Sequence, residues 1–282
     1  MKPLRTFIGV VFTIGIVAVV AAVAAAGSSP KPGQRALALW NRFPASATPR
    51  PVVPVGEGVV LDPATGFTTG AAKIAYIDGN FTLRTSLPKK PDRADGYRLL
   101  SARAGLRLLR SSAGKGPADS PPLAVTGVRL GTATFQTDRG KAKLPAWLFS
   151  FRGVTDPAAV LAVAPPEVFY PPTPRPFSNS FSDYQDDSAT VPRAGTQLII
   201  SFVGAPVGDR PCDASYSATS VHSAHAVAFS ISSRTVPFSG ACLAVGYRRS
   251  VILRLSSRLG GRALILASNG GVIPVTRQPT RR

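Results

Sequence analysis

The sequence predicts a mainly β, α+β protein with an N-terminal transmembrane helix, a lobe built as a helix on an antiparallel sheet, and a C-terminal β-sandwich-like lobe. Three observations lead to this prediction. With 26 Gly and 27 Pro in 282 residues, the composition favours turns and short connections over long helices. The N-terminus carries one uncharged apolar run of helical length. Short runs rich in β-branched and aromatic residues recur through the rest of the chain.

The apolar run, Phe7 to Ala26, follows Lys2 and Arg5. A helix rises about 1.5 Å per residue, so this run covers the roughly 30 Å core of a bilayer. The positive-inside rule then places the body on the extracytoplasmic side. We expect residues 1–27 to be a single-pass anchor in the cytoplasmic membrane. The small residues that end the run also fit a signal-peptidase site, so the alternative is secretion after cleavage near Ala26.

Residues 28–58 are rich in Pro, Ala and Arg, and their prolines favour extended backbone. We expect a stalk here. Trp40 has two interpretations, an interfacial position near lipid headgroups or packing on the body.

The first lobe is predicted over residues 59–164. Val59 to Leu61 and Lys73 to Ile77 are interpreted as strands, the second closed by Asp78-Gly79. Ser101 is a suitable N-cap for a helix to about Arg110, since Ala102, Leu106 and Leu109 share one face and three arginines share another.

A hairpin is predicted after this helix. Its arms are Val125 to Gln136 and Lys143 to Phe151, and Thr137-Asp138-Arg139-Gly140 supplies the Asp and Gly of a tight reversal.

Residues 165–194 are dominated by Pro, Ser and Asp and are predicted to be a linker. The second lobe, residues 195–277, is predicted to be sandwich-like, and residues 278–282 to be a basic tail. The strands expected in the second lobe are Gln197 to Val203, Ala214 to Ser220, Ala226 to Ser232, Ser250 to Leu255 and Ala263 to Ala267.

The capped helix and hairpin, residues 97–151, resemble PepSY-like modules of exported bacterial proteins, in which a helix packs on an antiparallel sheet. Over more of its length, the chain resembles uncharacterised membrane-anchored proteins of actinobacteria. The motifs that carry this second resemblance are Thr137-Asp138-Arg139-Gly140, Leu144-Pro145-Ala146-Trp147 and Leu259-Gly260-Gly261-Arg262. Neither resemblance implies a catalytic residue.

The formal net charge of +19 indicates either attraction to an anionic partner or a solvated Arg-rich surface. The export signal and the lack of a nucleic-acid-binding motif argue against nucleic acid. The expected partners are therefore the membrane, through the N-terminal helix, and an anionic envelope polymer or a protein.

Cys212 and Cys242 are the only cysteines, and in an oxidising compartment we expect them to form a disulfide. The alternative is a cysteine nucleophile, Cys242, paired with His222 or His225, because His222 precedes Ser239-Gly240-Ala241-Cys242 at a spacing that resembles L,D-transpeptidases. That family has His and Gly where this chain has Gly240 and Ala241.

No residue is predicted to be catalytic or to bind a cofactor or metal. Residues three apart on a strand point to opposite faces, so His222 and His225 would diverge. Asp183, Asp186 and Asp187 lack the repeating geometry of a calcium loop, and the two glutamates, Glu57 and Glu167, lie in Pro-rich connections. The function predicted is therefore a non-enzymatic envelope protein, with a cysteine enzyme or a regulatory module for a membrane partner as alternatives.

Overall fold

The protein is mainly β, with its strands in several sheets and only three helices among the residues described. The computed structural model describes residues 31–56, 58–89, 91–114, 121–174, 188–191, 195–243 and 245–277. The predicted anchor, Glu57, the acidic group Asp183, Asp186 and Asp187, and the basic tail lie outside these residues. Across the described ranges, no helix is both long and apolar enough to cross a membrane.

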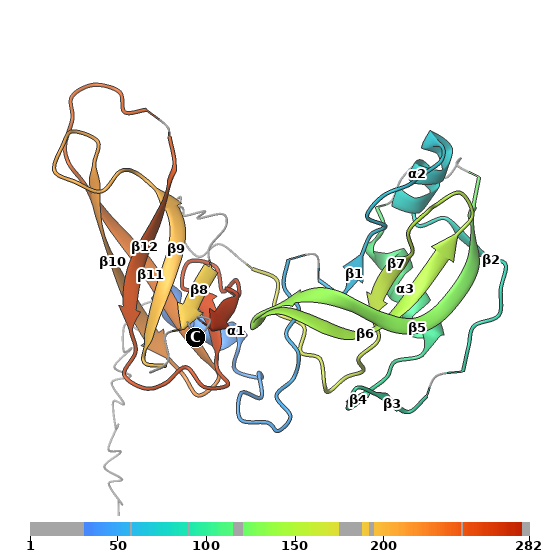
Figure 1. Cartoon of the computed structure of the whole chain (residues 1–282). Helices are drawn as coiled ribbons and strands as arrows, with labels where there is room; N and C mark the ends of the chain where they lie inside the picture. The colour runs from blue at the N-terminus through green and yellow to red at the C-terminus, as the bar shows by residue number, and fades with distance from the viewer. Residues whose placement is uncertain are drawn as a thin grey trace, which may run out of the picture. The chain divides into compact units, whose positions relative to one another are not determined.

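The first lobe is a five-stranded sheet with strand order β1-β7-β6-β5-β2, accompanied by two helices and a short ribbon of β3 and β4 (Figure 1). Neighbouring strands of the sheet are antiparallel except for the parallel pair β2 and β5. The elements are β1 (Val60–Leu61), α2 (Gly70–Ile77), β2 (Phe81–Leu83), β3 (Arg93–Ala94), β4 (Tyr97–Arg98), α3 (Ala102–Ser112), β5 (Leu123–Thr137), β6 (Gly140–Phe151) and β7 (Ala158–Leu161).

Helix α3 confirms the predicted capped helix. The Ser101 side chain accepts a hydrogen bond from the Ala104 amide, which satisfies one of the free N–H groups of the first turn. Leu106 and Leu109 are buried in the same core as Trp147 of β6. The indole N–H of Trp147 donates to the Leu100 carbonyl at 2.9 Å. The one polar group of the largest side chain in this core therefore has a hydrogen-bond partner.

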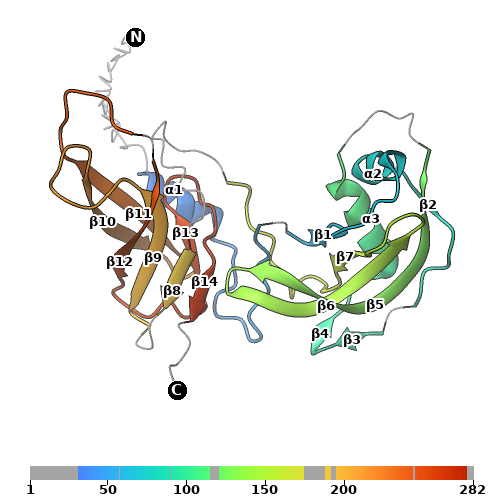
Figure 2. The ribbon, with the colours of Figure 1, turned by 45° about the horizontal axis from the view of Figure 1, so that its top comes forward.

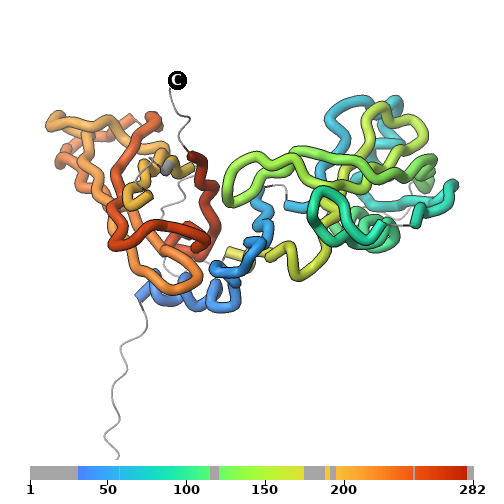
Figure 3. Tube along the Cα trace, turned by 60° about the horizontal axis from the view of Figure 1, so that its bottom comes forward, coloured from blue at the N-terminus to red at the C-terminus, as the bar shows by residue number. Residues whose placement is uncertain are grey.

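The predicted hairpin is also confirmed, and its two arms can be followed in green in Figure 3. β5 pairs with β6 from Val125↔Phe151 to Thr137↔Gly140, which leaves Asp138 and Arg139 as the two turn residues. Gly140 has a φ of 87°, a conformation that favours glycine.

One predicted strand is wrong. Lys73 to Ile77 belongs to helix α2, which starts at Gly70. The alternation of apolar residues suggested a strand, but the Thr69 hydroxyl accepts from the Ala72 amide and caps a helix instead. Asp78 follows as the C-cap, so the predicted closing turn ends a helix.

The second lobe is a sandwich of two sheets with strand orders β10-β11-β13 and β12-β9-β8-β14. Leu198 and Leu253 from one sheet and Val227 and Phe229 from the other share a single buried core. All five predicted strands are present. The elements are β8 (Ser188–Val191), β9 (Gln197–Gly204), β10 (Ala214–His222), β11 (Ala226–Thr235), β12 (Tyr247–Arg254), β13 (Ala263–Leu266) and β14 (Val275–Arg277).

The predicted stalk is wrong for residues 31–55. Helix α1 (Pro32–Leu39) lies against β10, β11 and β13 (Figure 2). Trp40 and Phe43 are fully buried with Ala228 and Ile265, and the Trp40 indole donates to the Gly270 carbonyl at 3.0 Å. Trp40 therefore packs on the body, because an aromatic cluster supplies the buried area that prolines alone lack.

The predicted linker also contributes to the packed structure. β8 lies within it and pairs with β9 and β14. Val168 forms a bridge with Val52, and both pack against the same core of the first lobe. The Pro-rich composition indicated a connection but hid these pairings.

Candidate functional site

A cavity with a volume of about 530 Å³ opens in the first lobe. Two arginines line it. Arg84 follows β2 directly and Arg152 follows β6 directly, and their amides donate to Val125 and Ala124 on the intervening strand β5. The sheet thus places two guanidinium-bearing residues on either side of one strand. The other lining residues are Thr69, Ala71, Ala72, Ala75, Thr82, Pro121, Pro122, Leu123 and Ala124.

The chemistry of this cavity favours an anion. Its described lining contains two arginines and two threonine hydroxyls but no carboxylate. The first turn of α2 also contributes to the wall, and the helix dipole adds a partial positive charge at that end. Guanidinium groups are suited to phosphate and carboxylate oxygens because their N–H groups form a planar fork.

A smaller cavity of about 290 Å³ lies where α2 meets α3, with Asp62, Lys73 and Tyr76 in its wall. The Tyr76 hydroxyl donates to Asp62 Oδ1 at 2.8 Å. Burial, together with this hydrogen bond and the Asp62 charge, raises the pKa of Tyr76 above its usual value. The phenol therefore keeps its proton and acts as the hydrogen-bond donor to Asp62.

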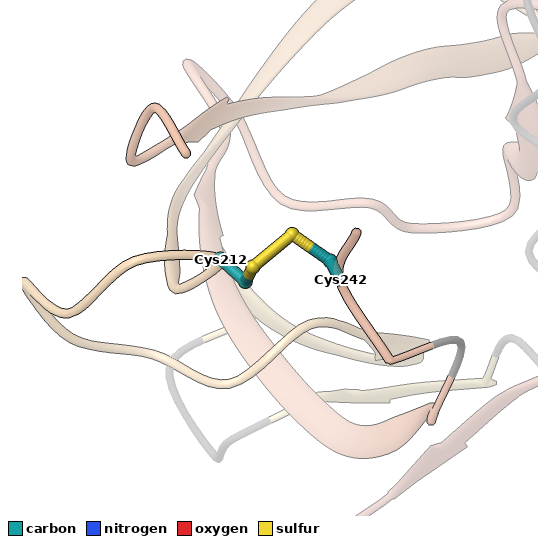
Figure 4. Close-up of a disulfide and its surroundings, with 2 residues drawn as sticks. All are labelled: Cys212 and Cys242. Atoms are coloured by element: carbon teal, nitrogen blue, oxygen red, sulfur yellow. A yellow bond between two sulfur atoms is a disulfide. The ribbon is translucent and has the colours of Figure 1, made fainter. Parts of the chain in front are cut away.

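Cys212 and Cys242 form a disulfide, as predicted (Figure 4). The bond joins the β9–β10 connection to the β11–β12 connection. Cys242 consequently offers no thiolate in this state. The disulfide and His222 also lie at opposite ends of β10, about 30 Å apart at the rise of a strand. The predicted alternative of a Cys242–His222 nucleophile pair is therefore wrong for this geometry.

His222 does contact a hydroxyl, since its Nε2 lies 3.0 Å from Ser220 Oγ. The other ring nitrogen, Nδ1, faces the guanidinium of Arg262 at 3.5 Å. Arg262 has only protons to donate, so Nδ1 is the acceptor and Nε2–H donates to the serine. A base for Ser220 needs the opposite tautomer and a carboxylate behind it. Burial and the Arg262 charge also lower the pKa of His222.

His225 does not join His222. Its Nδ1 lies 2.6 Å from the Phe43 carbonyl, which ties the β10–β11 turn to the segment after α1. Within the described part of the chain, no three His, Cys, Asp or Glu side chains gather closely enough to hold a metal. Glu167 pairs with Arg98 and Arg93 at the surface of the first lobe.

The hairpin tip forms a polar joint with the second lobe. Asp138 is 1% exposed, and its carboxylate pairs with the Arg50 guanidinium, with one Nη1–Oδ1 distance of 3.1 Å. Arg139 donates to the carbonyls of Gly260 and Arg262 at 2.9 and 2.8 Å. The structure thus brings together two motifs that lie about 120 residues apart in the sequence.

The charged groups at this joint, Arg50, Arg139 and Asp138, stay ionised and paired. Burial lowers the pKa of Arg139 to about 10, with Arg50 and Arg277 acting in the same direction and Asp138 against it. That value is far above neutral, so Arg139 stays protonated. The backbone of Asp138 is satisfied too, through Val53 and Val275. The joint is therefore a closed structural contact with no free reactive group.

Comparisons with known proteins do not assign this chain to a family. No protein-family model, curated protein or solved structure matches it.

Sequence reasoning missed the cavity residues Arg84 and Arg152. Each stands alone among many arginines in the sequence, and only the pairing of β2 and β6 with β5 brings them to one wall. The available signal was an arginine directly after each strand, which becomes informative only once the sheet order is known.

Proposed function

We propose that this protein is a non-enzymatic, membrane-anchored extracytoplasmic protein that binds an anionic component of the cell envelope, with the Arg84–Arg152 cavity as its binding site. The observation that carries the proposal is the cavity lining, which holds two arginines and two threonines without a described carboxylate. The extracytoplasmic location is supported by the apolar run after Lys2 and Arg5, and by a disulfide, which persists in oxidising compartments.

The ligand chemistry follows from the wall. The guanidinium and hydroxyl donors share one wall with the N-terminal turn of α2, and they suit the phosphodiester or carboxylate of an envelope polymer. Arg84 and Arg152 are both exposed enough for a chain of repeating anionic groups to reach them without entering a closed pocket. Binding by such exposed charges weakens as salt rises, since the Debye length falls from about 30 Å at 0.01 M to about 8 Å at 0.15 M.

The test is a titration of the full chain, held in detergent, with purified poly(glycerol phosphate) polymer. Arg84→Gln and Arg152→Gln should each weaken binding about tenfold, because one charge-assisted hydrogen bond contributes roughly 1.5 kcal/mol. Arg103→Gln is the matched control, since Arg103 is an exposed arginine on α3 outside the cavity wall. Equal binding by all three variants, or no binding by the parent chain at low salt, contradicts the proposal.

A further inference from the structure

Two connections at one end of the second lobe form a single loop pair, defined here as residues 205–213 and residues 236–243 with 245–246. They leave β9 and β11 at the same end of the sandwich and extend beyond the strands in Figure 1. The disulfide joins them covalently. Val236 donates to the Asp213 carbonyl at 2.7 Å and accepts from the Cys212 amide at 3.4 Å. The loop pair is therefore held as one unit.

This end of the lobe concentrates exposed apolar side chains. The described residues expose eleven large apolar side chains, and six of them lie on the loop pair or on the strand ends that carry it. Leu243 is 88% exposed and Val207 63%. The other four are Val203, Phe238, Val245 and Tyr247. None of the six lines either of the two cavities described above.

Arginines lie on the same loops and strand ends as these apolar side chains. Arg210, Arg234 and Arg248 are exposed, and Arg249 lies with its guanidinium 4.9 Å from the Tyr247 ring centroid. The carboxylates of this region are Asp209 and Asp213, and Asp213 accepts a hydrogen bond from the Arg210 amide. Four positive charges against two negative ones leave the rim basic, and a tyrosine beside an arginine is typical of the headgroup level of a membrane.

We propose that the loop pair is a membrane-docking surface that inserts its apolar side chains into an anionic lipid bilayer. Isolated leucine, valine and phenylalanine side chains on loops gain free energy in hydrocarbon, and the arginines meet lipid phosphates at the level above. Insertion into hydrocarbon explains the projecting apolar side chains, and attraction to lipid phosphates explains the basic rim. A soluble polyanion would use the rim alone and would leave Leu243 in water. The disulfide holds both loops in the inserting arrangement.

The experiment places a tryptophan at the most exposed position. Trp40 and Trp147 are buried, so Leu243→Trp adds the exposed reporter. The full chain is reconstituted in vesicles of 30% phosphatidylglycerol and 70% phosphatidylcholine, with and without a phospholipid that carries a quencher in its acyl chain. Emission of the introduced tryptophan should shift to the blue and fall at least twofold with the quencher. Ile77→Trp, at an exposed apolar site on α2, is the control and should not be quenched.

Charge is tested with the same reporter. Combining Leu243→Trp with Arg210→Gln, Arg234→Gln and Arg248→Gln should lower the inserted-to-free ratio of the loop pair, read from the quenching, about tenfold at matched lipid. Each basic residue near an anionic surface contributes roughly 1 kcal/mol, and part of that is screened. Unquenched, water-like emission from the reporter in the Leu243→Trp variant overturns the proposal. Equal quenching in pure phosphatidylcholine overturns its anionic preference. Neither result depends on Arg84 or Arg152, so the cavity proposal is judged separately.

Discussion

Two ends of antiparallel strands in this molecule are used in opposite ways. The tip of the β5–β6 hairpin is polar and buried, with Asp138 between Arg50 and Arg139. The loop pair at the end of β9–β12 is apolar and exposed, and a disulfide holds it. The polar turn can be buried because its charges are paired. The apolar loop pair can stay exposed because a disulfide, and not a hydrophobic core, holds it together. The joint thus stabilises the fold, whereas the loop pair presents a surface.

The largest effect is expected at the joint. Asp138→Ala removes the carboxylate that pairs with the part-buried Arg50 guanidinium and with Arg139, which should lower the free energy of unfolding by about 3–5 kcal/mol. Urea unfolding of the full chain in detergent measures this. The control is Asp156→Ala, because Asp156 accepts from Thr65 at an exposed site and should lower the free energy of unfolding by about 1 kcal/mol or less. Equal effects of the two variants would show that the joint is not a special contact.

The disulfide is expected to contribute nearly as much. Cys212→Ala with Cys242→Ala opens a loop with a sequence separation of 30, which should lower the free energy of unfolding by about 3–4 kcal/mol in the chain-entropy model. The same urea titration of the parent chain, with and without reductant, gives an independent measure. A variant as stable as the parent would mean that the loop pair is held by its backbone hydrogen bonds alone.

A smaller effect is expected at His222, whose Nδ1 faces the Arg262 guanidinium at 3.5 Å. Its pKa is lowered in the folded state, so the unfolded state binds the proton more tightly. Stability is therefore lost as pH falls from the usual histidine pKa toward the folded value. Arg262→Gln should raise the pKa of His222, measured by NMR titration of the ring protons. Arg258→Gln, at an exposed neighbour, should leave the titration unchanged.

The smallest effect is expected on the loop pair surface. Leu243→Ser changes a side chain that is almost wholly in water, so the free energy of unfolding should stay within about 0.5 kcal/mol of the parent. Leu253→Ala, at a fully buried position in the sandwich core, should lower it by about 2–5 kcal/mol. A large loss of stability for Leu243→Ser would mean that the loop pair covers part of the core and is no free surface.

The features predicted correctly are those with local signals. The β5–β6 hairpin has its turn chemistry within four residues, Ser101 lies directly before its helix, and two cysteines have only one pairing. The failures depend on distant partners. The predicted stalk is wrong because Trp40 and Phe43 pack on strands that come about 190 to 230 residues later. Packing of Trp40 on the body is one of the two interpretations of that residue, and no local pattern decides between them. β8 is likewise defined by β9 and β14, and the Arg84–Arg152 cavity by the order of strands around β5.

Because α1 packs on the second lobe, that contact decides which part of the chain bears a force applied at the N-terminal end of the described residues. β1 is the next strand after α1 in sequence, yet α1 packs on β11 and β13 of the second lobe. A pull applied at Lys31 is therefore resisted first by the contact of Trp40 and Phe43 with that lobe. When this contact has separated, the load passes to the Arg50–Asp138 pair and to the bridges of Val52 and Pro54 before it reaches β1. The contact of this N-terminal segment with the second lobe therefore has to break before the load reaches the sheet that bears the cavity.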